Sequence, residues 1–166
     1  NAGRLLQEGG ATAVKLEGGA HIIPLVHRMV AAGIPVMGHL GLTPQSVNQF
    51  GGHRVQGKTP AAAAKLIADA RMLEEAGAFA IVVEGVPADL AAEITATLAI
   101  PTIGIGAGAG CDGQVLVMHD LLGLTEGAPP KFVRQYVGLG DIARRAAELW
   151  ADDVRNQKYP SDAESY

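Results

Sequence analysis

The chain has 166 residues, of which 48% are hydrophobic and only 4% aromatic, and its 13 basic and 17 acidic side chains give a formal net charge of -4. This apolar content can fill a core of aliphatic side chains, which excludes a largely disordered chain, and the mild charge argues against nucleic acid or an anionic membrane as the main partner. Cys111 is the single cysteine, which excludes an intrachain disulfide and a cysteine-rich zinc site. No apolar run approaches the ~20 residues that cross a bilayer, and no signal peptide is recognisable, so we expect a cytoplasmic protein.

Apolar runs typical of strands alternate with helical patterns along the chain. The strand-like runs cover residues 13–17, 35–40, 79–84, 101–106 and 114–118. Apolar residues at helical spacing predict helices over residues 21–32, 60–76, 87–98 and 141–156. The second of these helices has the clearest ends, because Thr59 is a suitable N-cap, Pro60 a suitable first residue and Gly77 a stop signal. A polar, glycine-rich loop through residues 43–52 follows the second strand.

This alternation predicts an α/β protein with a parallel sheet covered by helices. One candidate is a small flavodoxin-like open sheet, which the chain length favours, and the other is the last five strand-helix units of a (β/α)8 TIM barrel. The barrel is favoured because Glu17, His39 and Glu84 lie at the carboxyl ends of different predicted strands, where such barrels place their chemistry. We therefore expect residues 1–156 to form the C-terminal part of a single barrel domain and residues 157–166 to form a loose tail.

Lys15 and Glu17 are two residues apart on the first predicted strand, so both side chains point to the same face. They could form a structural salt bridge, because each charge is costly to bury without a partner. Alternatively, the Glu17 carboxylate could be a ligand of Mg²⁺ and the Lys15 ammonium could bind an anionic substrate group. One carboxylate alone would leave such a metal site incomplete.

Glu84 ends the most hydrophobic predicted strand. This position suits a general base, and it equally suits a carboxylate that caps a strand or forms a structural ion pair. His39 has two corresponding interpretations, a core residue with satisfied nitrogens or a donor of a hydrogen bond to a substrate oxygen.

Three further motifs predict structural roles. The glycine-rich run 104–110 fits a dinucleotide fingerprint loosely, but no helix follows it at once, so we expect close backbone packing at the barrel rim. His119 and Asp120 resemble half of a metal-hydrolase pair, but no second histidine cluster accompanies them, so a structural pair is expected. Cys111 has no obvious base nearby and is expected to be inert.

Several motifs together resemble the ketopantoate hydroxymethyltransferase family. The first are GHLGLTPQSV at 38–47, FGG at 50–52 and VQG at 55–57. The others, in the order of the family, are VKLEGG at 14–19, EGVP at 84–87, IPTIGIGAG at 100–108, DGQ at 112–114 and PKF at 130–132. The resemblance extends from Asn1 to about Tyr159 and concerns motifs of this enzyme rather than of barrels in general.

This resemblance implies a (β/α)8 barrel that transfers a one-carbon unit from 5,10-methylenetetrahydrofolate to α-ketoisovalerate, giving ketopantoate for pantothenate and coenzyme A biosynthesis. It implies that the reaction passes through an enolate stabilised by Mg²⁺, with Glu84 as the base that removes the C3 proton. It further implies that Glu17 belongs to the Mg²⁺ environment, that Lys15 binds the keto acid and that His39 lies beside the substrate. A large homo-oligomer is also implied, with a decamer as the candidate size.

The sequence departs from the family in one important respect. The first three strands of the family's barrel, with further aspartate metal ligands and a serine that contacts the keto acid, have no counterpart, and Asn1 stands where a Met would be expected. We expect either that a separate N-terminal segment of the same barrel supplies them or that this chain is not active by itself. The alternative functions are another Mg²⁺-dependent lyase or mutase of the phosphoenolpyruvate mutase and isocitrate lyase group, and a non-catalytic barrel fragment.

Overall fold

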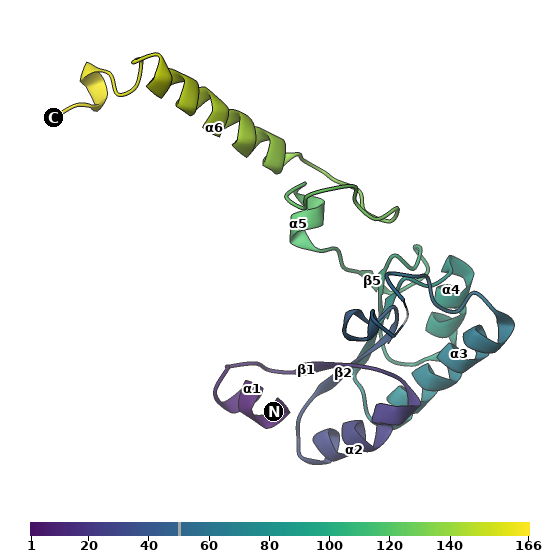
Figure 1. The fold of residues 1–166 in the computed structure, drawn as a ribbon. Coiled ribbons are helices and arrows are strands. Elements are labelled where there is room, and N and C mark those ends of the chain that lie inside the picture. Colours follow the sequence, from purple (N-terminus) through teal and green to yellow (C-terminus); the bar gives the residue numbers. More distant parts are fainter. Residues whose placement is uncertain (50) are drawn as a thin grey trace. The chain divides into compact units, whose positions relative to one another are not determined.

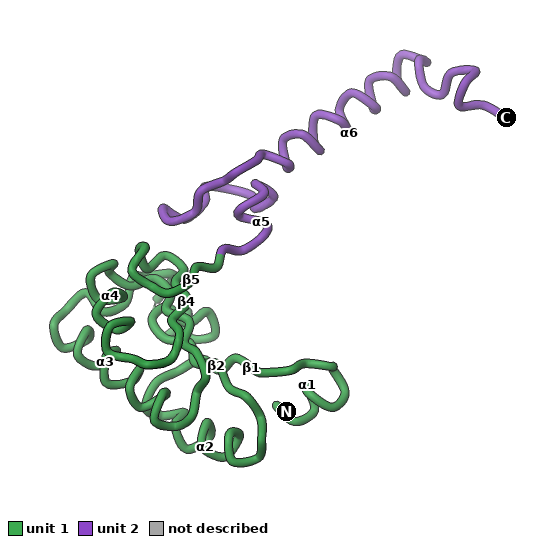
Figure 2. The backbone as a smooth tube through the Cα atoms, turned by 180° about the vertical axis from the view of Figure 1, so that it is seen from behind, with its two compact units in different colours: residues 1–115 green, residues 116–166 purple. Residues whose placement is uncertain are grey.

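The computed structural model describes residues 1–49 and 51–166, which form two compact units, unit 1 (residues 1–115) and unit 2 (residues 116–166), coloured separately in Figure 2. Phe50, which belongs to the FGG motif, lies outside the described residues. None of the helices in the described part of the chain is both long and apolar enough to cross a membrane. A single domain over residues 1–156 stays a prediction.

A parallel sheet forms the centre of unit 1 (Figure 1). Its strands are β1 (Val14–Glu17), β2 (Val36–Gly41), β3 (Ala80–Glu84), β4 (Thr102–Ile105) and β5 (Gly113–Gln114). They lie in the sheet in chain order, and every pairing is parallel. A flavodoxin-like sheet would place its first strand between the second and the third, so that alternative is wrong. The α/β class is confirmed, and the strand order is that of five consecutive strands of a (β/α)8 barrel.

The helices of unit 1 connect the first four strands. They are α2 (Ile23–Ala31), α3 (Pro60–Glu75) and α4 (Ala88–Thr97), while α1 (Ala2–Gln7) precedes the sheet and the short 3₁₀ helices η1 (Ala20–Ile22) and η2 (Pro44–Ser46) follow β1 and β2. The predicted start of α3 is confirmed, because the Thr59 hydroxyl accepts a hydrogen bond of 3.2 Å from the Ala62 N–H. The alternation is interrupted between β4 and β5, where a loop replaces the helix.

The core of unit 1 lies between the sheet and the helices. Its fully buried side chains come from both layers, and the largest hydrophobic ones are Val26, Val36, Leu73, Ile81, Val83 and Ile94. Side chains alternate between the two faces of a strand, so His39 and Glu84 point away from the helix layer that Ile81 and Val83 contact. The same alternation puts Lys15 and Glu17 on the face of His39, because Glu17 and His39 are register partners. The polar residues of three strands therefore share one face of the sheet.

Unit 2 contains α5 (Met118–Leu121), α6 (Leu139–Arg155) and η3 (Asp162–Glu164). The strand predicted over 114–118 is wrong beyond its first residue, because β5 ends at Gln114 and Met118 begins α5. Its pairing with β4 stops at Gln114, and an apolar alternation without a neighbouring strand gains no ladder of hydrogen bonds. The predicted last helix is confirmed as α6. The tail holds a short capped turn, in which the Ser161 and Glu164 side chains form a capping box.

Candidate active site

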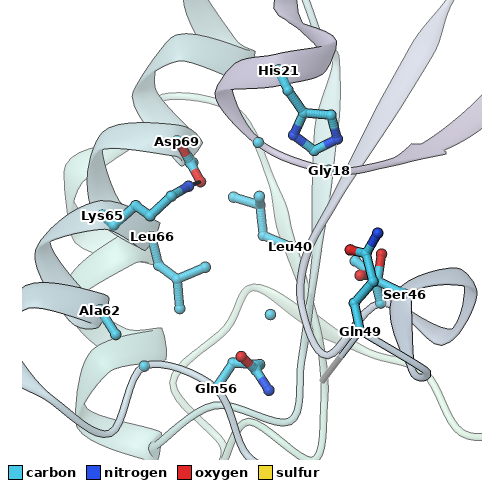
Figure 3. Close-up of a pocket in the computed structure, with 14 residues that line it drawn as sticks. Gly18, His21, Leu40, Ser46, Gln49, Gln56, Ala62, Lys65, Leu66 and Asp69 are labelled. Carbon is cyan, nitrogen blue, oxygen red and sulfur yellow. Dashed lines mark hydrogen bonds and ion pairs between the residues drawn. The ribbon is translucent and has the colours of Figure 1, made fainter. Parts of the chain in front are cut away.

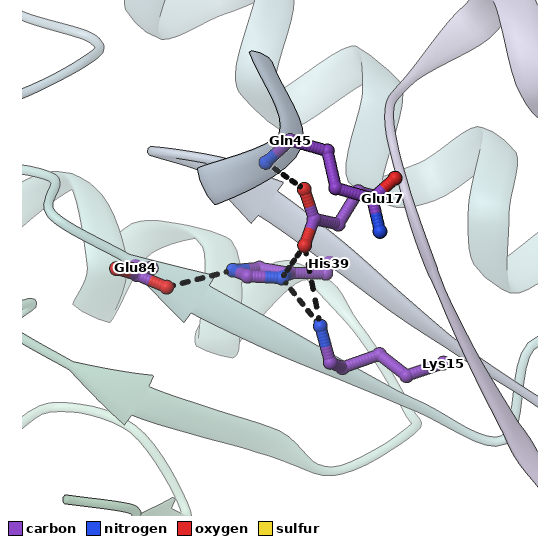
Figure 4. A network of polar contacts seen from close by, with 5 residues as sticks. All are labelled: Lys15, Glu17, His39, Gln45 and Glu84. Carbon is purple, nitrogen blue, oxygen red and sulfur yellow. Dashed lines mark hydrogen bonds and ion pairs between the residues drawn. The ribbon is translucent and has the colours of Figure 1, made fainter. Parts of the chain in front are cut away.

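Three charged side chains from β1 and β3 meet around one buried imidazole of β2 (Figure 4). The ring is that of His39, which is only 2% exposed. On one side of it, Lys15 Nζ lies 2.9 Å from His39 Nδ1 and 3.6 Å from Glu17 Oε1. On the other side, Glu84 Oε2 lies 3.1 Å from His39 Nε2. The structure thus brings together all of the predicted site residues, Lys15, Glu17, His39 and Glu84.

The close approach of β2 and β3 beside this site depends on Gly41. Its φ is +92°, a left-handed conformation that favours glycine. A Cβ at Gly41 would overlap with the carbonyl oxygen of Glu84, which accepts a 2.8 Å hydrogen bond from the Leu42 N–H. The GHLGL segment therefore carries the imidazole and, two residues later, the glycine that lets its strand pass next to Glu84.

The contacts of His39 define its tautomer. An ammonium group has only donors, so Lys15 donates to Nδ1, and in the neutral ring the hydrogen is on Nε2. The 3.1 Å separation between Nε2 and the Glu84 carboxylate is short, but the two groups are poorly aligned, and Nε2 has no hydrogen-bond partner among the described residues. Buried polar atoms are rarely left in this state. An oxygen atom of a bound substrate would satisfy it.

Glu17 is held by its neighbours but keeps one oxygen available. Its side chain is 8% exposed, and Oε2 accepts a hydrogen bond of 2.9 Å from the Gln45 N–H. Oε1 has only longer contacts, 3.6 Å to Lys15 Nζ and 3.7 Å to His39 Nδ1. The Lys15 side chain is 43% exposed, so its ammonium group is accessible to a ligand and is not sealed in an ion pair.

The donor set fits Mg²⁺ only in part. A carboxylate oxygen is the ligand type that Mg²⁺ prefers, and the metal commonly uses one or two carboxylates together with water and substrate oxygens. Over residues 1–49 and 51–166, however, no three His, Cys, Asp or Glu side chains are grouped so that they could hold a metal ion. Glu17 can therefore supply one ligand, and a complete coordination sphere needs oxygen atoms from elsewhere.

Two features near the site were missed by sequence reasoning. One is the backbone N–H of Gln45, for which no side-chain signal exists. The other is Asp69, a carboxylate of α3 that is 3% exposed and lines a cavity of about 260 Å³ bordered by Gly18, Leu40 and Leu66 (Figure 3). A signal for Asp69 was present, because it directly precedes the core residue Ala70 and stands four residues before Leu73.

The remaining motifs have structural surroundings. The glycine-rich loop after β4 packs on α4, where a Cβ at Gly110 would lie 2.8 Å from the Ala92 Cβ, and one at Gly108 would overlap with the Ala88 Cβ. This confirms close backbone packing and leaves no helix N-terminus for a pyrophosphate directly after the loop. Asp120 accepts a hydrogen bond of 2.6 Å from the Thr125 hydroxyl, and a structural pair of His119 with Asp120 stays a prediction.

Comparisons with known proteins identify the family of the chain. The ketopantoate hydroxymethyltransferase family matches residues 1–162. The proteins named 3-methyl-2-oxobutanoate hydroxymethyltransferase from Syntrophus aciditrophicus and Moorella thermoacetica are each 60% identical to the chain over 166 residues, and that of Carboxydothermus hydrogenoformans is 57% identical. These alignments cover 100% of this chain but 61%, 62% and 60% of the three relatives, so the chain spans about three fifths of their length. The chain belongs to the ketopantoate hydroxymethyltransferase family.

Proposed function

We propose that this chain carries the residues that convert α-ketoisovalerate (3-methyl-2-oxobutanoate) into ketopantoate, with 5,10-methylenetetrahydrofolate as the one-carbon donor. The observation that supports this most is the buried Nε2 of His39, without a hydrogen-bond partner in the described part of the chain and 3.1 Å from the Glu84 carboxylate. It provides a donor for a substrate oxygen directly beside a candidate base. The names of the relatives point to the same keto acid.

In the proposed reaction, Glu84 removes the C3 proton of the keto acid, and the resulting enolate carbon forms a bond to the methylene carbon carried by the folate. The bonds between that carbon and the folate nitrogens break, so that tetrahydrofolate leaves, and water supplies the hydroxyl group of ketopantoate. His39 donates its Nε2 hydrogen to a substrate oxygen, and this hydrogen bond becomes stronger as that oxygen gains negative charge. Lys15 binds the keto acid and offsets the charge of its carboxylate. Because Lys15 also donates to Nδ1, it keeps the hydrogen of the imidazole on the nitrogen that faces Glu84.

Glu17 would hold Mg²⁺ through its free oxygen Oε1. When bound, the metal supplies a positive charge that polarises the keto group. We propose that its other protein ligands belong to an N-terminal segment of the same barrel, beyond these 166 residues, in keeping with the greater length of the relatives. The whole protein is proposed to act in the cytoplasm as a homo-oligomer, with neither nucleic acid nor a membrane as a partner.

Proton exchange at C3 tests the first step without the folate. α-Ketoisovalerate is incubated in D₂O with the chain and Mg²⁺, and loss of the C3 proton signal is followed by NMR. Glu84→Gln should slow exchange by at least about 100-fold, since a positioned base contributes 10²–10⁴-fold. Glu93→Gln, an exposed residue of α4, should leave the rate unchanged.

Two outcomes would contradict the proposal. Undiminished exchange in Glu84→Gln would remove Glu84 from the role of base. No exchange by the unmodified chain with Mg²⁺ would favour a non-catalytic fragment, and adding the N-terminal part of a relative in trans would then show whether the missing ligands are the cause.

A further inference from the structure

Asp69 is a buried carboxylate that the proposed reaction does not use. It lies on α3, is 3% exposed, and is followed by the core residues Ala70 and Leu73, both 0% exposed. Burial of a carboxylate among apolar side chains is strongly unfavourable unless charge pairing and hydrogen bonds compensate for the lost hydration. An apolar residue would fill this helix position at lower cost, so the contacts of Asp69 indicate what the carboxylate does.

These contacts connect α3 to the turn that follows β1. Asp69 Oδ2 accepts a hydrogen bond of 2.5 Å from Lys65 Nζ, one helical turn earlier, and Figure 3 shows the amine directed at the carboxylate. Asp69 Oδ1 accepts a hydrogen bond of 3.2 Å from the backbone N–H of Ala20, the first residue of η1. Ala20 is separated from Glu17 only by Gly18 and Gly19. Asp69 is thus bonded to the backbone three residues after Glu17.

The turn is fixed from two sides. On the sheet side, the Gly18 N–H donates a hydrogen bond of 3.1 Å to the His39 carbonyl oxygen, and the Gly18 φ of +133° requires a glycine-like conformation. On the helix side, the Asp69 carboxylate occupies the place that a Cβ at Gly19 would take. Gly18 and Gly19 also border the cavity of about 260 Å³, so packing covers this part of the turn only on some sides.

We propose that Asp69 is a positioning residue: through Ala20 it holds the Gly18–Gly19 turn, and through the turn it holds the Glu17 carboxylate against the Gln45 N–H. The proposal rests on the proposed function only because that function makes Glu17 a site residue. Its physical basis is that a displacement of about 1 Å at a functional group is enough to lower the rate of a reaction that depends on it.

Hydrogen exchange of the Gln45 amide reports the position of Glu17 directly, because this amide donates to Glu17 Oε2 at 2.9 Å. Glu17→Ala, measured by ¹⁵N-resolved NMR on the full chain, sets the exchange rate without the acceptor. Asp69→Ala should speed Gln45 exchange by about tenfold towards that limit, as expected when a hydrogen bond to a charged group is weakened. Asp69→Asn keeps an oxygen that Ala20 can donate to, so most of the protection should return.

Asp112→Ala is the matched control. Asp112 is a second carboxylate that holds a strand by its backbone, since it accepts a hydrogen bond of 2.8 Å from the Thr102 N–H of β4. Asp112→Ala should lower the stability of unit 1. When variants are compared at equal unfolding free energy, it should leave the hydrogen-exchange rate of the Gln45 amide unchanged. If Asp69→Ala does not fold, Gly19→Ala tests the same contact from the turn, because its Cβ must displace the carboxylate.

The proposal is overturned if Asp69→Ala speeds hydrogen exchange of the Ala20 amide but leaves the exchange rate of the Gln45 amide unchanged. It is also overturned if Asp112→Ala speeds exchange of the Gln45 amide as much as Asp69→Ala does. C3 proton exchange separates this result from the proposed function. If the unmodified chain exchanges the proton, Asp69→Ala should lower the rate at saturating keto acid and Asp69→Asn should restore it. If it does not, the proposed function fails, while the Gln45 amide still decides the role of Asp69.

Discussion

Units 1 and 2, which Figure 2 colours separately, keep their secondary structure by different contacts. Unit 1 encloses a parallel sheet whose helices contribute fully buried side chains such as Leu73 and Ile94. Unit 2 contains α6, a helix of 17 residues in which no described residue is buried, and whose Leu149 and Trp150 are 62% and 56% exposed. The contacts that stabilise α6 are local: Arg144 forms an ion pair of 2.9 Å with Glu148, one helical turn away. Apolar side chains therefore form a core in unit 1, whereas those of α6 form an exposed stripe.

The largest expected difference concerns leucine truncation. Leu73→Ala should lower the unfolding free energy by about 2–5 kcal/mol, because it removes a fully buried side chain and leaves a cavity. Leu149→Ala should change it by less than about 0.5 kcal/mol, the usual range for exposed positions. Urea unfolding followed by far-UV circular dichroism measures both. Equal losses would mean that α6 is covered in solution.

Glycine substitution separates strain from close packing. Gly41 and Gly127 both have positive φ, +92° and +85°, so an alanine is strained at either position. Only at Gly41 does a Cβ meet another atom, the Glu84 carbonyl oxygen, whereas nothing lies within 4 Å of a Cβ at Gly127. Gly127→Ala should cost about 1 kcal/mol, and Gly41→Ala should cost clearly more. Thermal unfolding compares them, and a similar Tm for the two variants would contradict the packing of β2 against β3.

The pH dependence of stability should also differ between the units. The backbone N–H and the hydroxyl of Thr102 lower the pKa of Asp112, and the Ser161 hydroxyl and backbone N–H lower the pKa of Glu164. A carboxyl whose pKa is lowered by folding stabilises the fold above its unfolded pKa of about 3.9, and this contribution is lost as the pH falls through the folded value. Asp112→Asn should therefore destabilise unit 1 more at pH 7 than at pH 3. Glu164→Gln, in the tail, should leave the main unfolding transition unchanged at both pH values.

The smallest expected effect concerns the quenching of tryptophan fluorescence. Trp150 is the single tryptophan and is 56% exposed, with its ring centre 6.3 Å from that of Tyr159. Acrylamide should quench its fluorescence nearly as well in the native chain as in urea. Strong protection that increases with protein concentration would show instead that a second copy covers α6.

Much of the fold could be predicted from local patterns. Thr59, Pro60 and Gly77 marked α3 because capping and stop signals act within one turn of the chain. The sequence could predict that the candidate site residues lie together at one end of the sheet, because the carboxyl ends of parallel strands meet at one edge. The structure brings these residues together: Lys15, Glu17, His39 and Glu84. The roles of these residues come from the family resemblance and stay predictions. The predicted end of the last strand at Met118 was wrong because its pairing with β4 stops at Gln114, and residues 115–118 do not encode where that pairing stops.

The sequence by itself determined the order of strands and helices and which residue types stand at the strand ends. Only the tertiary structure decided that Lys15 bonds to Nδ1 of His39, that Glu84 faces the opposite nitrogen, and that the sheet follows chain order. It also decided that Asp69, 49 residues from Ala20, holds the turn beside Glu17. The physical reason is range: hydrophobic periodicity and capping act over a few residues, whereas hydrogen bonds and close packing join side chains that are distant in the chain.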